Sequence, residues 1–305
     1  MSGPVEPVDR RCENDVLAGT EVREGRATSV AGLAVTRVLP TKGRRTVGAW
    51  CFVDLMGPVD AEQPNPMEVG PHPHIGLSTV TWLLEGEALH SDSLGTEQVI
   101  RRGQLNWMTA GHGIAHAELA ARPPFQGVQM WVAQPEATRH GASRFEHHGE
   151  LPEFELPGVT GRLLVGSFAG AVSPAQTDTA LVGAEIDVRE GTVALPVESH
   201  FEHAVAPLDG TVRVGDQIVE PGWLALVPPG VAELPVTARG DARLLLLGGE
   251  PLGEPIEMWW NYVARTKDEI TAAWVDWRDR TDRFGEVPTR LERLEAPVPP
   301  WVVPG

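Results

Sequence analysis

The segment Thr79-Val80-Thr81-Trp82-Leu83-Leu84-Glu85-Gly86 decides the fold class of this chain of 305 residues. Polar and apolar side chains alternate at its start, before the turn dipeptide Glu85-Gly86, and a period of two is typical of a β-strand. The stretch Val35–Leu39 alternates in the same way. Further turn dipeptides follow roughly every eight to twelve residues, as expected for short antiparallel strands: Leu94-Gly95, Arg102-Gly103 and Ala110-Gly111. The pattern predicts an all-β barrel or sandwich.

A second series of turn dipeptides lies between Leu181 and Leu247 and resembles the first: Asp209-Gly210, Gly215-Asp216, Pro221-Gly222 and Pro229-Gly230. One glycine spacing recurs in both series. Two glycines are eight residues apart in each: Gly103 and Gly111, then Gly222 and Gly230. Matched spacings of this kind indicate a duplicated β-barrel.

The expected domains are residues 1–135 and residues 136–305, because the polar, proline-containing stretch 134–160 has the composition of a linker.

Near the C-terminus, Thr266-Lys267-Asp268-Glu269 has the form of a capping box. In a capping box the hydroxyl of Thr266 accepts from the amide of Glu269, and the carboxylate of Glu269 accepts from the amide of Thr266. Apolar residues then follow at helical spacing: Ile270, Ala273, Trp274 and Trp277. This pattern predicts a short amphipathic helix that ends before Phe284-Gly285, with its tryptophans packed in the core.

The bulk composition excludes several classes of protein. A formal net charge of −17, with no Lys/Arg run longer than a pair, argues against a direct nucleic-acid partner, which requires a cationic face. No apolar run approaches the length of a membrane span, and residues 1–10 lack the apolar core of a signal peptide. We therefore expect a cytoplasmic protein, a monomer, with no membrane contact. Its two cysteines, Cys12 and Cys51, are expected to be reduced thiols.

Two short motifs place metal-ligating side chains on one face of a strand, because residues i and i+2 of a strand point the same way. In Pro71-His72-Pro73-His74 two imidazoles share a face, and in His116-Ala117-Glu118 an imidazole and a carboxylate do. If these segments lie on neighbouring strands, four ligands converge on the barrel interior. Three neutral imidazoles and one carboxylate suit Fe(II), Mn(II), Ni(II), Cu(II) or Zn(II). Short histidine spacings also arise by chance, so histidines without a metal remain the alternative at this point.

Other histidines compete for the same role. His90 and Asp92 repeat the i, i+2 spacing, but they fall between two close turn signals and are interpreted as the end of a hairpin rather than a ligand pair. His112 lies in a glycine-rich turn just before His116. The pair His147-His148 lies in the polar stretch assigned to the linker, which predicts solvated side chains.

Three segments in the first half of the chain resemble the pirin family: His72-Pro73-His74-Ile75-Gly76, Thr79–Gly86 and Trp107-Met108-Thr109-Ala110-Gly111-His112-Gly113-Ile114-Ala115-His116-Ala117-Glu118. The stretch Gly249–Ile256, followed by Thr266–Ile270, is similar to pirins as well. The likeness covers nearly the whole chain beyond residue 30. It implies a bicupin fold of two antiparallel cupin β-barrels with a single metal, usually iron, in the N-terminal barrel. The family's ligands fall on the residues that the strand argument selects: His72, His74, His116 and Glu118. With the predicted helix, the expected fold is an all-β bicupin with a short C-terminal helix.

The resemblance also implies a choice between functions. Several pirins are similar in activity to quercetin 2,3-dioxygenases, which open a flavonol ring with dioxygen, and Glu118 would then serve as metal ligand and as general base. Other pirins are described as transcription co-regulators that bind proteins, with the iron redox state as a switch. The expected partner is accordingly a small aromatic substrate or a protein, such as a metabolic enzyme or transcription factor. A third hypothesis is a structural bicupin with a vestigial site.

The chain departs from the common pirin pattern beside the ligands. Many pirins carry a basic residue, an aromatic residue and Glu where Ile75, Leu77 and Ser78 stand here, and Tyr where Trp82 stands. We therefore expect a pocket rim that is more apolar and less charged. The candidate pocket walls, for which core packing is an equally good explanation, are Met108, Trp82 and Trp107.

The internal repeat predicts where a second metal site would lie. Counting from the matched glycines places the equivalents of the four ligands at Pro196, Glu198, Pro235 and Thr237. These residues do not supply three imidazoles and a carboxylate. His200 and His203 lie nearby, but their i, i+3 spacing does not place both on one strand face. We therefore expect the C-terminal barrel to be structural and to lack a metal.

Overall fold

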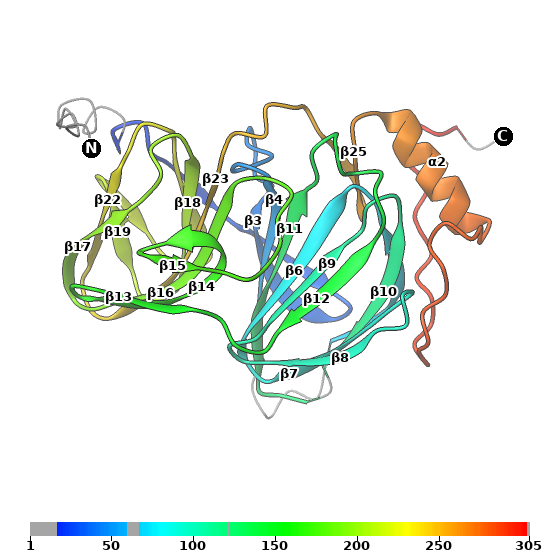
Figure 1. Cartoon of the computed structure of the whole chain (residues 1–305), viewed down its shortest axis with the longest axis horizontal. Helices are drawn as coiled ribbons and strands as arrows, with labels where there is room; N and C mark the ends of the chain where they lie inside the picture. The colour runs from blue at the N-terminus through cyan, green and yellow to red at the C-terminus, as the bar shows by residue number, and fades with distance from the viewer. Residues whose placement is uncertain (1–16, 60–66, 121, 304–305) are drawn as a thin grey trace, which may run out of the picture.

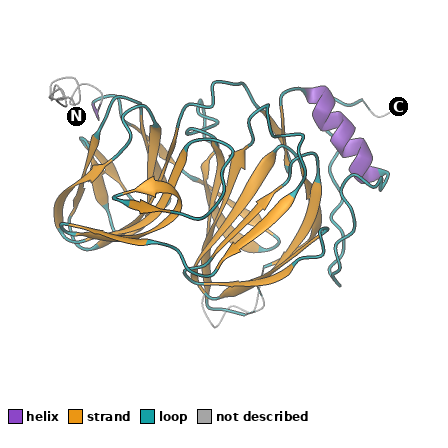
Figure 2. Cartoon of the chain, in the orientation of Figure 1, coloured by secondary structure: helices purple, strands orange, loops and turns teal. Residues whose placement is uncertain are grey.

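The computed structural model describes residues 17–59, 67–120 and 122–303. Its regular structure is mostly β, and Figure 2 shows strands throughout, with helix α2 (Lys267–Arg278) at one end. The strands form two barrels, one from each half of the chain, that lie side by side (Figure 1). The prediction of an all-β bicupin with a short C-terminal helix is confirmed.

The first barrel consists of two antiparallel sheets. Its strands are β2 (Arg26–Val30), β3 (Leu33–Leu39), β4 (Trp50–Val59), β5 (Glu68–His74), β6 (Leu77–Glu85), β7 (Glu87–Asp92), β8 (Glu97–Arg101), β9 (Leu105–Thr109), β10 (Ile114–Leu119), β11 (Phe125–Ala133) and β12 (Arg144–His148). The larger sheet has the order β12-β9-β6-β11-β4-β3-β2, and the smaller has the order β5-β10-β7-β8. The predicted strand that begins at Thr79 is the major part of β6, in the middle of the larger sheet.

The second barrel repeats this arrangement. Its strands are β1 (Glu21–Glu24), β13 (Glu153–Leu156), β14 (Val159–Phe168), β15 (Ala171–Val172), β16 (Leu181–Val188), β17 (Gly191–Pro196), β18 (Glu202–Asp209), β19 (Val212–Val214), β20 (Gln217–Val219), β21 (Trp223–Val227), β22 (Glu233–Ala238) and β23 (Ala242–Gly249). The larger sheet has the order β1-β21-β18-β23-β16-β14-β13, with β15 paired to β14, and the smaller has the order β17-β22-β19-β20. Position by position, β18 matches β6, β23 matches β11, β16 matches β4 and β17 matches β5. The predicted duplication is confirmed by this shared topology.

The two barrels share an apolar core where their large sheets meet. Trp50, Trp82 and Trp107 of the first barrel are buried there with Leu164 and Leu245 of the second. The indole N–H of Trp50 lies 3.2 Å from the carbonyl oxygen of residue 182 and 3.1 Å from that of residue 248. Because a buried indole N–H needs an acceptor, these contacts fix how the second barrel sits on the first.

Both ends of the described chain cross to the other barrel. β1 precedes the first barrel in sequence but pairs with β21 of the second. After β23 the chain returns over the first barrel as β24 (Glu257–Trp259), β25 (Tyr262–Ala264) and α2. Tyr262 and Trp277 of this segment are buried in one cluster with Ile75 and Ala115 of the first barrel. The boundary at residues 135 and 136 stays a prediction, while the C-terminal helix packs on the N-terminal barrel.

Helix α2 begins as predicted. The hydroxyl of Thr266 accepts from the amide of Glu269 at 3.2 Å. In the other half of the capping box, the carboxylate of Glu269 accepts from the amide of Arg265 at 2.8 Å and also interacts with the amide of Thr266. The residues at helical spacing are buried as predicted: Ile270, Ala273, Trp274 and Trp277.

The prediction of a linker over residues 134–160 is wrong. β12 lies within this stretch and pairs with β9, and β13 pairs with the beginning of β14. β12 is polar because it is an edge strand whose side chains are only half-buried. His147 is therefore not fully solvated, and its Nδ1 lies 2.7 Å from the amide oxygen of Asn106.

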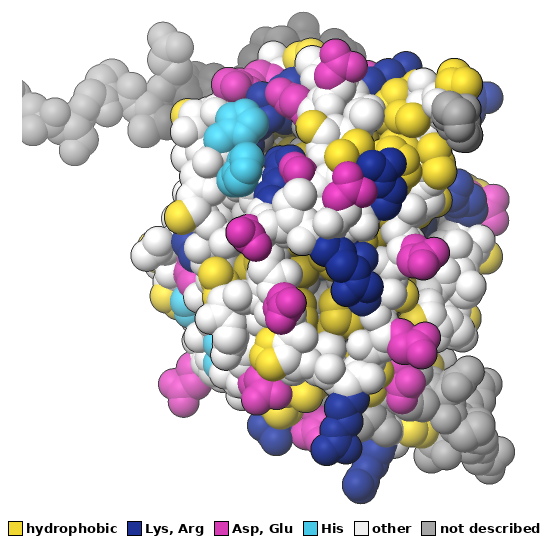
Figure 3. Space-filling view, turned by 90° about the vertical axis from the view of Figure 1, so that its right-hand side faces the viewer, with side chains coloured by type: hydrophobic (Ala, Val, Ile, Leu, Met, Phe, Trp, Pro, Cys, Tyr) yellow, Lys and Arg dark blue, Asp and Glu magenta, His cyan; other side chains and the backbone are white. Residues whose placement is uncertain are grey.

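Cys51 is a buried free thiol, whereas Cys12 lies outside the described residues. None of the described helices has the length and apolar character needed to span a membrane. On the face shown in Figure 3, Lys and Arg side chains are interspersed with Asp and Glu rather than gathered into a basic patch.

Candidate metal centre

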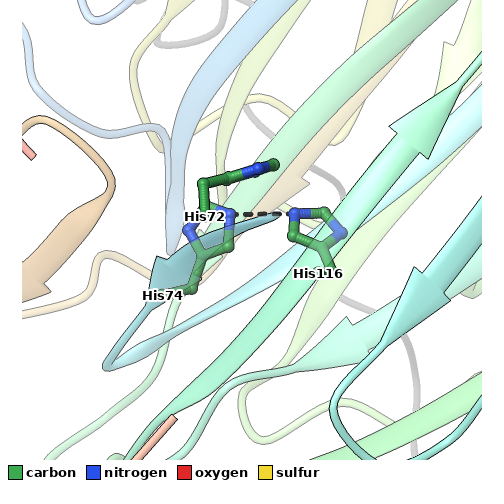
Figure 4. A group of neighbouring side chains, drawn as sticks. All are labelled: His72, His74 and His116. Atoms are coloured by element: carbon green, nitrogen blue, oxygen red, sulfur yellow. Dashed lines mark hydrogen bonds between the residues drawn. The ribbon is translucent and has the colours of Figure 1, made fainter. Parts of the chain in front are cut away.

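Three imidazoles meet inside the first barrel. β5 carries His72 and His74, and the neighbouring β10 carries His116 opposite His72 in the strand register. The ring centroids of His72 and His116 are 4.3 Å apart, and the Nε2 atoms of His74 and His116 are 3.1 Å apart. One nitrogen of each ring lies within 4.8 Å of the other two, and Figure 4 shows the three side chains grouped around one point. The structure thus brings together three of the four residues selected from the sequence.

Backbone carbonyls fix which nitrogen of two of these rings faces the centre. Nδ1 of His72 donates to the carbonyl oxygen of Gly70 at 2.9 Å, and Nδ1 of His74 donates to that of Asn261 at 2.9 Å. Because a carbonyl only accepts, the proton of each neutral ring is on Nδ1. Both rings therefore present an unprotonated Nε2 to the centre, which is the form that binds a transition metal.

The third imidazole, His116, is oriented by His90 and Asp92. Nδ1 of His116 lies 3.4 Å from Nδ1 of His90, and Nε2 of His90 donates to the carboxylate of Asp92 at 3.0 Å. Because the carboxylate only accepts, Nε2 of His90 carries a proton, and Nδ1 of His90 can accept from Nδ1 of His116. When His116 donates in this way, its Nε2 carries no proton and can bind a metal.

The interpretation of His90 and Asp92 as a hairpin end is confirmed, because β7 ends at Asp92, pairs with β8, and the Asp92 carboxylate accepts from the turn amides of Leu94 and Thr96. Both are buried on β7, where they lie opposite Glu118 and His116 of β10 on the inner face of the sheet. Neither belongs to the group of three nitrogens, so the view that they are not a ligand pair agrees with the geometry. The signal for their inward direction was the same i, i+2 spacing that identified the ligand motifs.

Burial keeps the three central imidazoles neutral. It lowers the pKa of His72 to about 4, and it lowers the pKa values of His74 and His116 well below their usual range, an effect that the neighbouring imidazoles reinforce. The Nε2 atoms of His74 and His116 are at hydrogen-bond distance, and a divalent cation can take the place of the proton between them. Three neutral imidazoles whose nitrogens lie this close fit a transition metal.

Glu118 lies apart from the three nitrogens. Its side chain is buried in the same cavity, but no carboxylate oxygen falls within the 4.8 Å group. The strand register shifts between His116 and Glu118, so that Glu118 lies opposite Val69 of β5. Burial raises the pKa of the Glu118 carboxyl, and a hydrogen bond with Thr81 opposes that rise. A carboxyl of this kind can hold a proton more readily than an exposed one.

The three histidines and Glu118 line a cavity of about 420 Å³. Phe52 and Trp131 form one wall, with their rings stacked at a centroid distance of 4.0 Å. Arg37 lies over the Phe52 ring at 4.3 Å and forms two hydrogen bonds of 2.8 Å with the carboxylate of Asp54. The volume is within the range of about 300–1,000 Å³ that is usual for small-molecule sites. The cavity can therefore take a flat aromatic molecule beside the histidines.

Core packing, the alternative explanation for the candidate walls, is confirmed, and the predicted rim residues do not line the cavity. Trp82 and Trp107 are buried between the barrels, and Met108 belongs to a separate small cluster. The rim residues Ile75, Leu77 and Ser78 are also absent from the cavity lining, since they point toward the packed C-terminal segment or toward Thr109. His112 is exposed in its turn, away from the three histidines. The actual walls come from strands β4 and β11, which carry no motif that marks them in the sequence.

The chain is similar to known proteins along most of its length. The family model described as Pirin matches residues 32–132, and the model described as Pirin C-terminal cupin domain matches residues 184–285. A Pseudomonas aeruginosa protein named "Putative quercetin 2,3-dioxygenase" is 44% identical over 277 residues, which cover 89% of this chain and 88% of that protein. Pirin of Mus musculus is 30% identical over 223 residues, which cover 70% of this chain and 77% of that protein.

A solved structure extends the likeness to three dimensions. The crystal structure of a quercetin 2,3-dioxygenase from Acinetobacter baumannii superimposes with a TM-score of 0.89 at 38% identity, covering 93% of this chain and 97% of that one. The two family models occupy the first and second barrels in the order that the topology requires. From its sequence and its fold alike, this chain belongs to the pirin family.

Proposed function

We propose that this protein is a mononuclear metal-dependent dioxygenase that opens the ring of a flavonol, or of a similar aromatic molecule with an enol group. The observation that carries the proposal is the convergence of three imidazole nitrogens on the wall of an aromatic-lined cavity. The similarity to proteins named as quercetin 2,3-dioxygenases supports this reaction class.

The metal would be held by His72, His74 and His116, with Glu118 as the fourth ligand. Iron(II) is the metal proposed, and Mn, Ni, Cu or Zn also suit three imidazoles and one carboxylate. When bound, such a metal supplies a Lewis acid with open positions for a substrate oxygen and for dioxygen. The carbonyls of Gly70 and Asn261 and the His90–Asp92 pair hold the ligand rings in place.

The remaining residues of the cavity bind and orient the substrate. The Phe52–Trp131 stack offers a flat apolar wall against which an aromatic ring packs. Arg37 and Asp54 neutralise each other, so the cavity admits a neutral molecule without an unpaired charge. Glu118 acts as the base: its buried carboxylate takes the proton of the enol hydroxyl, and its raised pKa favours retention of that proton.

Oxygen uptake tests the proposal directly. Iron-loaded protein mixed with quercetin in air is expected to consume dioxygen as the flavonol absorbance falls. The matched control is His200→Ala, which removes an exposed histidine of the second barrel. His74→Ala should abolish uptake, and the control should not.

The alternative is a non-catalytic regulator whose metal controls binding to a metabolic enzyme or a transcription factor. It predicts one bound metal per chain and no oxygen uptake with any flavonol. That result would remove the dioxygenase proposal and leave the metal site intact.

A further inference from the structure

The second barrel has a cavity with one wall at a strand position that also forms a wall of the metal-site cavity in the first. In the first barrel, Phe52, Trp131 and Thr79 lie in one row across β4, β11 and β6. The matching strands β16, β23 and β18 carry the corresponding row: Val182, Gly248 and His203. Val182 and His203 line a cavity of about 360 Å³. The two cavities therefore share one wall position, Phe52 and Val182, and the second has no counterpart of the ligand histidines.

Gly248 makes room for the imidazole of His203. A Cβ atom at position 248 would lie 2.7 Å from Cδ2 of His203 and 2.9 Å from Cγ1 of Val182, which is closer than real Cβ contacts allow. His203 fills the space that a larger side chain on β23 would take, as Trp131 does on β11. Its ring is 1% exposed, so it is part of the barrel interior.

Both ring nitrogens of His203 are buried, and neither has a hydrogen-bond partner among the residues that the structure describes. Burial lowers the pKa of His203 to about 4, so the ring is neutral at pH 7 and offers one donor and one acceptor. A buried polar atom without a partner costs about 1–3 kcal/mol, and for this reason such atoms are rare in folded proteins. Two of them on the ring of a residue that lines a cavity indicate a polar partner from outside the chain.

The remaining lining residues restrict the chemistry of that partner. Phe168, Val182 and Val197 provide apolar walls, and Val172 is 69% exposed at the rim. Glu198 is the charged residue of the lining, so an anion would be repelled. His203 belongs to no group of three metal-ligating side chains in the described part of the chain, which argues against a metal. A neutral molecule with an apolar body and a hydroxyl group satisfies both the walls and the ring, because a hydroxyl both donates and accepts.

We propose that the mouth of the second barrel is a binding site for a small, neutral phenol, whose hydroxyl pairs with the imidazole of His203 while its ring packs against Phe168 and Val182. The site is separate from the metal centre, and its occupant is bound without a metal. It does not depend on the dioxygenase activity proposed for the first barrel.

The test uses the full chain loaded with zinc, a diamagnetic metal, and observes the side-chain ¹⁵N resonances of His203 by NMR. Phenol is the probe, and toluene is its control of similar shape without the hydroxyl. We expect saturable shifts of the His203 nitrogens with phenol, and an affinity for toluene that is weaker by up to about tenfold, the value of one hydrogen bond. His203→Leu assigns the resonances and should reduce phenol affinity to that of toluene. The matched control His200→Leu, an exposed neighbour, should leave it unchanged.

Three results would overturn the proposal. They are the absence of saturable His203 shifts up to the solubility limit of phenol, equal affinities for phenol and toluene, and unchanged phenol affinity in His203→Leu measured by calorimetry. If His203→Leu fails to fold, Val197→Trp provides the second variant, because it narrows the cavity from its partly exposed wall. Phenol affinity that persists in Val197→Trp would also overturn it.

Discussion

Three matching strand positions, across β4, β11 and β6 in the first barrel and β16, β23 and β18 in the second, carry different side chains in the two barrels. In the first barrel the cavity is bounded by a Phe52–Trp131 stack and by three imidazoles whose outer nitrogens have partners. In the second barrel the row holds Gly248 and His203, and no described residue is bonded to either nitrogen of His203. The strand framework therefore fixes where a cavity forms, but it does not determine what the cavity binds.

The difference arises from what surrounds each cavity. The carbonyl that orients His74 belongs to Asn261, in the segment that returns from the second barrel to cover the first. Among the described residues, the second barrel receives β1 and the preceding Leu17 in exchange, and β1 pairs with β21 at the edge of its large sheet. A metal centre requires such outer partners, because they fix the orientation of each ligand imidazole and decide which of its nitrogens carries the proton. The C-terminal segment is thus part of the centre, although it follows the second barrel in sequence.

The largest effect should come from removing a ligand of the first barrel. His74→Ala is expected to lower metal affinity by about a hundredfold or more, since one of the four proposed ligands would supply roughly a quarter of a binding free energy of about 10–16 kcal/mol. Metal content measured by elemental analysis after dialysis checks this, with His200→Ala as the control. Retention of one metal per chain in His74→Ala would mean that the centre lies elsewhere.

A smaller loss of metal affinity should come from moving the proton of His90 from one ring nitrogen to the other. Asp92→Asn places an amide N–H beside Nε2 of His90, so the His90 proton moves to Nδ1 and faces Nδ1 of His116. His116 then has to carry its proton on Nε2, where it blocks metal binding. We expect metal affinity to fall by about 10–100-fold, as is usual for outer partners of ligand histidines. Competition with a chelator measures it, and an unchanged affinity would show that His90 does not orient His116.

In the second barrel, Gly248→Ala should destabilise the fold, because its Cβ would overlap the ring of His203. Overpacking of this kind costs about 1–3 kcal/mol. The matched control is Gly240→Ala, where a Cβ meets nothing within 4 Å. The free energy of unfolding in urea should fall for the first variant alone, and equal values for both would contradict the tight contact between Gly248 and His203.

The stability of the fold should also depend on pH through His203. The folded pKa of His203 is about 4, below the usual value of 6.5, so the unfolded chain takes up this proton first as pH falls. The contribution of the neutral His203 to the free energy of unfolding is complete above pH 6.5. It is lost between pH 6.5 and about 4, at about 1.4 kcal/mol per pH unit. The free energy of unfolding of the wild type should therefore decrease more steeply with acid than that of His203→Leu. Parallel curves over this window would mean that His203 is protonated in the folded state.

The parts that the sequence predicted are those governed by local periodicity. Alternation at Thr79–Leu84 identified a strand, and the i, i+2 spacings identified the inward faces of His72, His74 and His116. The cavity walls were missed because Phe52 and Trp131 meet only through the pairing of β4 with β11, a contact between residues far apart in sequence. Polar composition misled at residues 144–148, since an edge strand and a linker have the same residues. The role of Asn261 was not predictable either, because it depends on how the C-terminal segment packs.

Anomalous diffraction at the iron absorption edge, from crystals of the iron-loaded full chain, tests the centre most directly. We expect one strong anomalous peak within bonding distance of the Nε2 atoms of His72, His74 and His116, and no peak beside His203. A peak bonded to Nδ1 atoms, a peak in the second barrel, or no peak at the three histidines would contradict the assignment of the metal site.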